Sequence, residues 1–193
     1  MICVAVTGSY ASGKSFVLEY VEDLGYKTFS ADKCIKELYK KPEIQHMVLN
    51  ILPELHSFDK NSISELIYSN DEARNRLQHL MHPFAIEALS NFKEQNSKLD
   101  ITFAEIPLLF EAGFDKYFDF YVTTFCSEET RLKRAEARNS FNLKSYNKIK
   151  QIQLPQEIKM EKSDFVINTD MDINKQITEL IQRLNAAIKR NNP

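Results

Sequence analysis

The sequence has no apolar run that approaches the roughly 20 residues a helix needs to cross a lipid bilayer. Its apolar start, MICVAVT, has no basic segment ahead of it and leads directly into a polar loop, so we expect a strand there and no secretion signal. Positive charge is not in excess either, because 25 Lys and Arg residues stand against 27 Asp and Glu residues. This balance lacks the basic footprint of a nucleic-acid-binding protein. We therefore expect neither membranes nor nucleic acids as partners.

Cysteine is also scarce. Cys3, Cys34 and Cys126 are an odd number, lie far apart and form no CxxC pair. This usage predicts reduced thiols and a cytoplasmic location. The 193 residues, of which 43% are hydrophobic, are enough for one domain with its own core and a small insertion.

Only four glycines occur, and two of them lie in one loop, GSYASGKS at residues 8–15. Gly8, Gly13, Lys14 and Ser15 match the pattern G-x-x-x-x-G-K-[ST]. Glycines let the backbone approach an anion closely, and the loop amides and the following helix attract it. Lys14 would lie between the β- and γ-phosphates, and the Ser15 hydroxyl would bind Mg²⁺. A strand before the loop and a helix after it favour a nucleoside-triphosphate site over a chance match in a surface turn.

Strand and helix patterns alternate along the chain. A strand at 2–7, a helix after Lys14 and a short strand at 26–30 form a βαβ unit. Residues 41–100 are polar and helical in pattern, which predicts a helical insertion at one edge of the sheet. Further strands are expected at 101–110, 118–125 and 164–168. Two helices are expected between the last two of these strands, and an amphipathic helix at the end of the chain. The pattern predicts an α/β fold with a doubly wound, parallel, five-stranded sheet.

Neither N-K-x-D nor D-x-x-G occurs, so the chain lacks the motifs of a GTPase switch. A short chain with a phosphate loop, a helical insertion and a late basic segment favours a small-molecule kinase. Such an enzyme needs an acceptor pocket beside the loop and a mobile cover that excludes water.

Two carboxylates are expected at the carboxyl ends of the strands, where ligands bind in open parallel sheets. Asp32 follows the strand at 26–30, and Glu105 lies within the expected strand 101–110. Asp32 fits two alternatives, either accepting the proton of an attacking hydroxyl or capping a helix N-terminus. Glu105 fits either a Mg²⁺ water shell or an ordinary strand position.

Basic residues gather late in the chain. Arg131, Arg134 and Arg138 recur at i, i+3 and i+7, which predicts one helix face. For Arg131 we favour a solvated face paired with neighbouring glutamates, and for Arg138 a contact with phosphate. The following lysines are consistent with a hinged lid over anionic ligands. In the insertion, His82 precedes Pro83, which favours a polar contact at a helix break.

A resemblance to one family rests on six stretches in order along the chain: TGSYASGKS, SADK, FDKNSISELIYSNDEARNRLQHLMHP, IPLLFEAGFDKYFDF, EETRLKRAEARN and QLPQEIKMEKSDFVIN. The chain resembles dephospho-CoA kinases over nearly its whole length. The loop is common to many kinases, whereas PLLFE and the succession of the other stretches are much more specific. The resemblance implies a P-loop kinase core with CoA-binding and lid segments. It also implies that ATP phosphorylates the 3′-hydroxyl of the ribose of dephospho-CoA, the last step of coenzyme A synthesis.

The resemblance also implies roles for particular residues. Asp32 would be the base, and Lys14 and Arg138 would complete the catalytic set. ATP would be bound by Gly8, Ala11, Ser12, Gly13, Lys14, Ser15, Phe16 and Arg138, with Mg²⁺ held by Ser15 and, through water, by Glu105. Dephospho-CoA would be bound by Asp32, His82, Pro107, Leu108, Leu109 and Glu111. We expect one kinase domain over residues 1–193, with a core of 1–40 and 101–193, an acceptor-binding insertion of 41–100 and a lid of about 138–162.

The chain departs from the family pattern at several positions. The family usually has GGIGSGKST, so Ser9 and Ala11 replace glycines and Phe16 replaces Thr. Its DAD is SAD here, its RD is Arg138-Asn139, Ile86 replaces an Arg, and Glu105 replaces Asp in many members. None of these changes removes a group that the chemistry requires. The alternatives are a P-loop kinase of another small hydroxyl or nucleotide acceptor, and an ATP-binding module that has lost catalysis.

Overall fold

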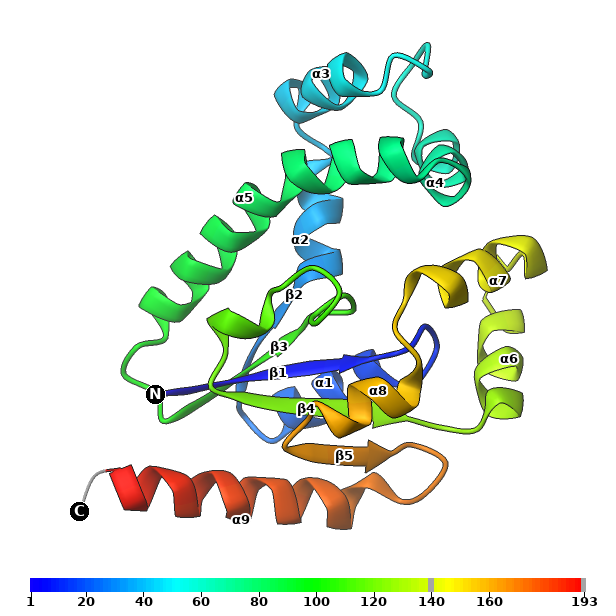
Figure 1. Cartoon of the computed structure of the whole chain (residues 1–193). Helices are drawn as coiled ribbons and strands as arrows, with labels where there is room; N and C mark the ends of the chain where they lie inside the picture. Colours follow the sequence, from blue (N-terminus) through cyan, green and yellow to red (C-terminus); the bar gives the residue numbers. More distant parts are fainter. Residues whose placement is uncertain (139–140, 192–193) are drawn as a thin grey trace.

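A parallel five-stranded sheet forms the centre of the molecule (Figure 1). The computed structural model describes residues 1–138 and 141–191. Within them the strand order is β2-β3-β1-β4-β5, and every neighbouring pair is parallel. The strands are β1 (Ile2–Gly8), β2 (Lys27–Ser30), β3 (Ile101–Glu105), β4 (Phe120–Phe125) and β5 (Phe165–Asn168). The α/β fold with five parallel strands, predicted from the alternating pattern, is confirmed.

The sheet register brings four strand ends to one place. Glu105 at the end of β3 pairs with Val6 of β1 and with Ser30 of β2. Gly8, the last residue of β1, pairs with Thr124 of β4. Because parallel strands all end at the same edge, the phosphate loop after β1 and the start of the helix after β2 face one another there.

Helices cover both faces of the sheet because successive side chains of each strand point to opposite faces. Val4 and Val6 pack with α1 (Lys14–Asp23) and α9 (Ile173–Asn191) on one face. Cys3 and Ala5 pack on the other face against α5 (Asp71–Gln95). The central strand is therefore buried on both sides, as its continuous apolar run predicts.

The segment between β2 and β3 is helical throughout its regular structure. Its helices are α2 (Ala31–Leu38), α3 (Pro42–Ile51), α4 (Lys60–Ser69) and α5. A separate apolar cluster, which includes Val48, Leu52 and Leu77, joins α3, α4 and the first half of α5. The second half of α5 reaches the sheet through Ala85 and Leu89. One long helix thus connects the insertion to the core.

Pro83 lies inside α5 and does not end it, so the helix break expected there is wrong. A proline removes one backbone hydrogen bond and crowds the preceding turn, which usually ends or kinks a helix. Here the apolar contacts on both sides of Pro83, at Met81 and Ala85, hold the helix together across it.

Two further expectations are corrected. The strand predicted at 101–110 ends at Glu105, and the chain then turns through residues 107–113. Pro107 has no backbone N–H to extend the ladder, and its carbonyl oxygen accepts from Lys159 Nζ at 2.8 Å. Among the described residues, three helices rather than two separate β4 from β5: α6 (Glu128–Glu136), α7 (Leu143–Ile152) and α8 (Gln156–Glu161).

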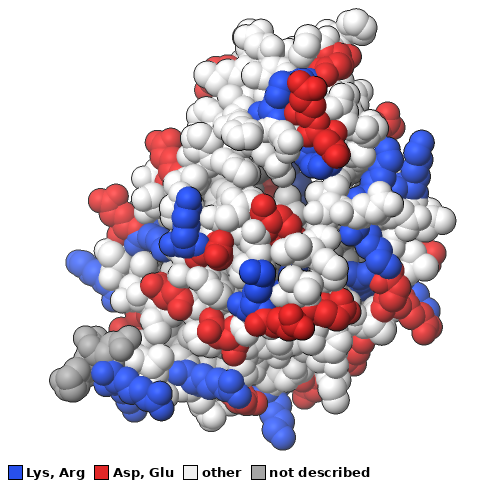
Figure 2. All heavy atoms as spheres, viewed as in Figure 1, with Lys and Arg blue, Asp and Glu red and all other residues white. Residues whose placement is uncertain are grey.

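The surface carries both signs of charge. On the face shown in Figure 2, Lys and Arg side chains are interspersed with Asp and Glu among the described residues, and they form no continuous basic patch there. No helix in the described part of the chain combines the length and the apolar character that a membrane span requires.

The close approach of Gly8 to β4 gives a testable requirement. A Cβ at Gly8, where φ is +145°, would lie 2.4 Å from the Thr124 carbonyl oxygen, whereas a Cβ at Gly25, where φ is +92°, meets nothing within 4 Å. Gly25→Ala should cost about 1–2 kcal/mol of unfolding free energy through backbone strain alone. Gly8→Ala should cost a further ~1–3 kcal/mol because backbone atoms must move. Urea unfolding of both variants checks this, and equal losses would contradict it.

Candidate active site

The phosphate loop is held in an unusual backbone conformation at the end of β1. Gly8, Ala11 and Gly13 all have positive φ, of 145°, 63° and 92°. Alanine in the left-handed region costs roughly 1–2 kcal/mol, so the surrounding contacts must impose the conformation at Ala11. Ser12 supplies one of them, because its Oγ lies 2.7 Å from Thr124 Oγ1 on β4. The loop is thus shaped before any ligand arrives.

Lys14 begins α1 and turns its side chain back into the loop. Its Nζ donates to the carbonyl oxygens of Gly8 at 3.1 Å and Ser9 at 3.0 Å. Burial lowers the pKa of Lys14 to about 8, although the nearby carboxylates of Glu105 and Asp32 act in the opposite direction. The arrangement places a buried ammonium against the backbone carbonyls of the phosphate loop.

Glu105 connects the phosphate loop to β2. Its Oε1 accepts from Ser15 Oγ at 3.0 Å, and its Oε2 accepts from Ser30 Oγ at 3.3 Å. The carboxylate is only 5% exposed, yet it lines the cavity beside the loop. Hydroxyl and carboxylate oxygens are the ligands that Mg²⁺ takes, with water and nucleotide phosphates completing its shell. The pair therefore fits a magnesium site, although no group of three or more His, Cys, Asp or Glu that could hold a metal occurs among the described residues.

Asp32 is exposed, lies in the first turn of α2 and does not cap that helix. Ser30 is the N-cap, since its side chain accepts from the Lys33 backbone N–H. The capping alternative for Asp32 is therefore wrong. Asp32 instead lines the same cavity as Lys14 and Glu105, which leaves its carboxylate available to a ligand.

This cavity, called the loop cavity below, has a volume of about 490 Å³. Its lining includes Gly13, Lys14, Ser15, Asp32, Glu105 and Arg138. Ala11, Phe16 and Pro107 lie there too. The structure thus brings together most of the residues expected at the phosphate and metal sites, from the loop after β1, α1, α2, β3 and the segment after α6.

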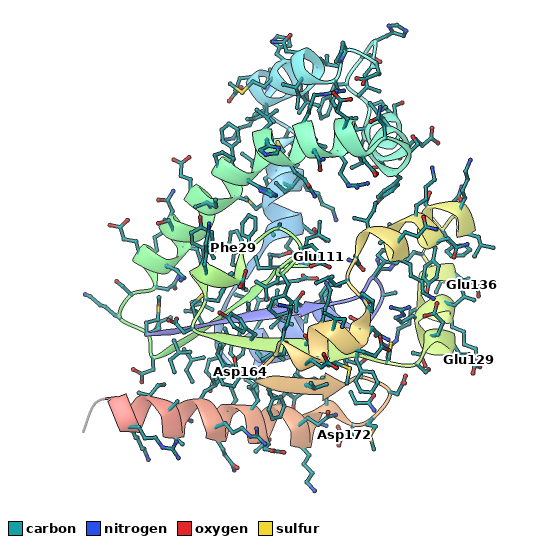
Figure 3. The ribbon with its side chains drawn as sticks, in the orientation of Figure 1. Phe29, Glu111, Glu129, Glu136, Asp164 and Asp172 are labelled. Carbon is teal, nitrogen blue, oxygen red and sulfur yellow. The ribbon has the colours of Figure 1, made fainter. Side chains whose placement is uncertain are left out.

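The three arginines do not share one environment, so the single helix face expected for them is wrong. The α6 helix ends at Glu136, which leaves Arg138 beyond it in the lining of the loop cavity. Arg134 donates to Thr169 Oγ1 and Thr169 O, both at 2.8 Å. Arg131 is buried and pairs with Glu128, so the solvated face favoured for it is also wrong. Glu129 and Glu136 do point outward from α6 (Figure 3).

The comparisons with known proteins agree on one family. The family model for dephospho-CoA kinase matches residues 2–175. A dephospho-CoA kinase of Rickettsia bellii is 53% identical over 191 residues, covering 97% of this chain and 100% of that protein. The chain belongs to the dephospho-CoA kinase family.

Solved structures give the same fold. A dephospho-CoA kinase from Campylobacter jejuni has a TM-score of 0.63 at 26% identity, covering 98% of both chains. A protein of Thermus thermophilus has a TM-score of 0.80 at 23% identity, covering 94% of this chain and 96% of that one. The P-loop kinase fold predicted from the sequence is confirmed, and the chain is a kinase by family.

The residues that the family resemblance assigns to the acceptor are less concentrated. Pro107 lines the loop cavity, whereas Leu109 is fully buried in the core between the sheet and α5. His82 is half-buried and packs edge-on against Phe114, with ring centroids 5.0 Å apart. Leu108 is half-buried in the turn after β3. These four assignments stay predictions.

Glu111 forms an ion pair in the interior. Its Oε1 lies 2.8 Å from Nζ of the fully buried Lys159 and accepts from the Leu154 backbone N–H at 2.9 Å. Its Oε2 is buried and has no hydrogen-bond partner in the described structure. Figure 3 shows Glu111 in the turn that follows β3. Its role toward the acceptor also stays a prediction.

Sequence reasoning missed several residues of the site. Ser30 was visible only as part of SADK, and its bond to Glu105 depends on the register of β2 against β3. Tyr10, Gln153 and Lys159 carried no signal of their own. Asn139, noted as a departure from the family, lies outside the described residues.

The lowered pKa of Lys14 predicts proton uptake on binding of ATP, the phosphate donor that the family implies. The free ammonium loses its proton as the pH rises through about 8. Triphosphate oxygens favour the charged form, so the bound pKa should be higher. At about pH 8.5, binding should take up a fraction of one proton, and affinity should fall above about pH 8.

Calorimetry in two buffers of different ionisation enthalpy measures that uptake. Lys14→Arg is the matched control, because a guanidinium stays charged throughout this range. Equal uptake in both proteins would contradict the assignment to Lys14.

Proposed function

We propose that this chain transfers the γ-phosphate of ATP to the 3′-hydroxyl of the ribose of dephospho-CoA, giving CoA and ADP. One observation carries the proposal: a single cavity holds the phosphate loop with Lys14 and Ser15, the carboxylate of Glu105 and the free carboxylate of Asp32. Membership of the dephospho-CoA kinase family identifies the acceptor class.

On the donor side, the loop binds the β- and γ-phosphates. Gly8 and Ser12 hold the loop against β4, and Ala11 and Gly13 turn its backbone amides toward the cavity. The Lys14 ammonium leaves its two carbonyl partners for phosphate oxygens. Phe16, which is 55% exposed at the start of α1, flanks the nucleotide. Such preorganised groups stabilise the charge that spreads over the phosphoryl oxygens in the transition state.

Magnesium completes the donor side. Ser15 Oγ would bind the ion directly, and Glu105 would hold its water shell. When bound, Mg²⁺ would supply positive charge that offsets part of the negative charge of the phosphates. The Ser15–Glu105 hydrogen bond keeps both groups beside the loop until then.

On the acceptor side, Asp32 orients the ribose hydroxyl and takes its proton. A bond forms between the 3′-oxygen and the γ-phosphorus, and the bond from that phosphorus to the bridging oxygen breaks, which releases ADP. Arg138, also in the cavity lining, neutralises the developing charge. Catalysis is then largely a matter of positioning and electrostatics.

The rest of dephospho-CoA would extend past the turn after β3. Pro107, Leu108, Leu109 and Glu111 in that turn, together with His82 on α5, are the residues that we assign to it. We assign the core to 1–40 and 101–193, the acceptor-binding insertion to 41–100, and the lid to about 138–162, of which 139–140 lie outside the described residues. The cytoplasmic location stays a prediction.

Asp32→Asn tests the role of the base. It should lower kcat at least about a hundredfold, the scale of general-base loss, with ATP affinity little changed. Asp23→Asn, an exposed aspartate at the end of α1 and outside the cavity, is the control and should be fully active. Steady-state kinetics with dephospho-CoA measure both. A normal kcat for Asp32→Asn would remove Asp32 from the reaction.

The reaction itself is tested by ADP release from ATP and Mg²⁺, with and without dephospho-CoA. ADP formation that depends on the acceptor, with CoA as product, is the expected result. Turnover only with another hydroxyl or nucleotide acceptor would replace the substrate. No turnover in a protein that binds ATP would indicate a module that has lost catalysis through its departures from the family pattern.

A further inference from the structure

Tyr10, the third residue of the phosphate loop, lies between two cavities. One is the loop cavity. The other, called the lid cavity here, has a volume of about 300 Å³ and is lined by residues that include Glu128, Arg131, Tyr146 and Lys150. Tyr10 and Gln153 line both cavities. The pair therefore forms the partition between them.

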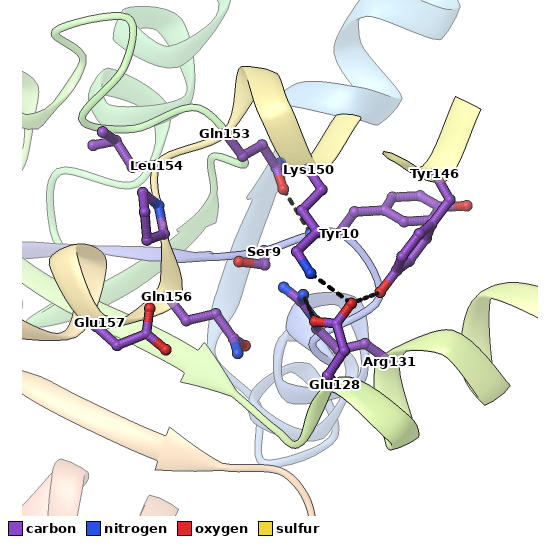
Figure 4. Close-up of a pocket in the computed structure, with 11 residues that line it drawn as sticks. Ser9, Tyr10, Glu128, Arg131, Tyr146, Lys150, Gln153, Leu154, Gln156 and Glu157 are labelled. Atoms are coloured by element: carbon purple, nitrogen blue, oxygen red, sulfur yellow. Dashed lines mark hydrogen bonds and ion pairs between the residues drawn. The ribbon is translucent and has the colours of Figure 1, made fainter. Parts of the chain in front are cut away.

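Three contacts join Tyr10 to the segment that runs from Arg138 to Gln153. The Tyr10 backbone N–H donates to Gln153 Oε1 at 2.7 Å (Figure 4). The Arg138 guanidinium lies over the Tyr10 ring, 4.7 Å from its centroid. The Tyr146 ring packs edge-on against the Tyr10 ring, with centroids 6.2 Å apart. One loop residue thus meets the beginning, the middle and the end of this segment.

These contacts differ from those that hold α7 to its own neighbours. Glu128 on α6 accepts from Tyr146 Oη at 3.0 Å and from Lys150 Nζ at 2.9 Å, as Figure 4 shows. That cluster ties α7 to α6 and makes no hydrogen bond to the phosphate loop among the described residues. The contacts of Tyr10 connect α7 to the loop, beside an apolar cluster in which Ala11 of the loop and Tyr146 of α7 are both buried.

The contact with the Tyr10 ring restricts the side chain of Arg138. It is exposed and lies beyond the end of α6, so its long side chain would otherwise sample many rotamers. A guanidinium over an aromatic face is held by the ring quadrupole and by stacking. The Tyr10 ring therefore keeps the guanidinium above the loop, where it helps to lower the pKa of the Lys14 ammonium.

We propose that Tyr10 is a positioning residue that couples the lid segment to the phosphate loop and holds Arg138 ready for the transferred phosphoryl group. The proposal rests on the function proposed above for its kinetic consequence. Its structural consequence is independent of that function. Without the ring and the Gln153 contact, α7 would separate from the loop more often, and the two cavities would merge.

The structural consequence is tested first, with no substrate present. In Tyr10→Leu, the amides of α7 should exchange with deuterium about tenfold faster than in the unaltered protein, because lost tertiary contacts lower the free energy of local opening. The amides of β1 and β4 should be unchanged. Tyr10→Phe keeps the ring, and no hydrogen bond to the Tyr10 hydroxyl occurs in the described structure, so α7 should stay protected. Unchanged exchange of α7 in Tyr10→Leu would overturn the coupling whatever the enzyme phosphorylates.

The kinetic consequence separates positioning from simple destabilisation. Tyr10→Leu should lower kcat about tenfold while the KM for dephospho-CoA changes less than about twofold, and Tyr10→Phe should restore kcat. In an Arg138→Met background, Tyr10→Leu should have less than about a twofold further effect, because the group it positions is gone. Additive losses in the double variant would overturn the role toward Arg138.

Gln153→Leu provides a second route if Tyr10→Leu does not fold. It removes the acceptor of the Tyr10 backbone N–H and leaves the ring in place. We expect faster exchange near the carboxyl end of α7, with a smaller loss of kcat than in Tyr10→Leu. No change in either measurement would show that the Gln153 contact does not couple the two segments.

Discussion

The ammonium group of Lys14, buried at the end of the central strand, determines how the surrounding site is built. Lys14 is almost fully buried, and its charge is balanced by two loop carbonyls and the Glu105 carboxylate. An isolated charge in that position would be very unfavourable, so its surroundings must be polar and fixed. Positive φ at Gly8 and Gly13 and the close approach of Thr124 and Thr169 supply that rigidity. The lowered pKa of Lys14 shows that burial still disfavours the charged ammonium, which a bound anion would stabilise.

The parallel sheet explains why this single charge can organise a kinase site. The ends of β1, β2 and β3 converge, so Glu105 reaches Ser15 on one side and Ser30 on the other. Ser30 in turn begins α2 and presents Asp32 to the same cavity. Ser15, Glu105 and Ser30 therefore form one hydrogen-bonded frame beside the phosphate loop, and preorganised polar groups of this kind need little reorganisation during a reaction.

The segment that we propose as a lid is joined to the phosphate loop by contacts of another kind. Around Tyr10, an aromatic ring, a guanidinium and one hydrogen bond connect the loop to α7, whereas α5 is held to the sheet by buried apolar side chains. Contacts of the first kind are few and partly exposed, which suits a segment that opens and closes. The extensive apolar contacts of α5 hold the insertion to the sheet.

The phosphate loop and the parallel sheet could be predicted from the sequence alone, because both depend on residues that are close together along the chain. Gly8, Gly13, Lys14 and Ser15 act within one strand–loop–helix unit, and the alternation of strands with helices predicted the parallel sheet. The position of Asp32 in the loop cavity, the burial of Arg131, the continuity of α5 through Pro83 and the end of β3 at Glu105 became visible only in the folded chain. The position of Asp32 depends on the pairing of β2 with β3, and the continuity of α5 depends on the apolar clusters that Met81 and Ala85 join on either side of Pro83. A local pattern specifies which element forms, whereas register and packing specify which side chains meet.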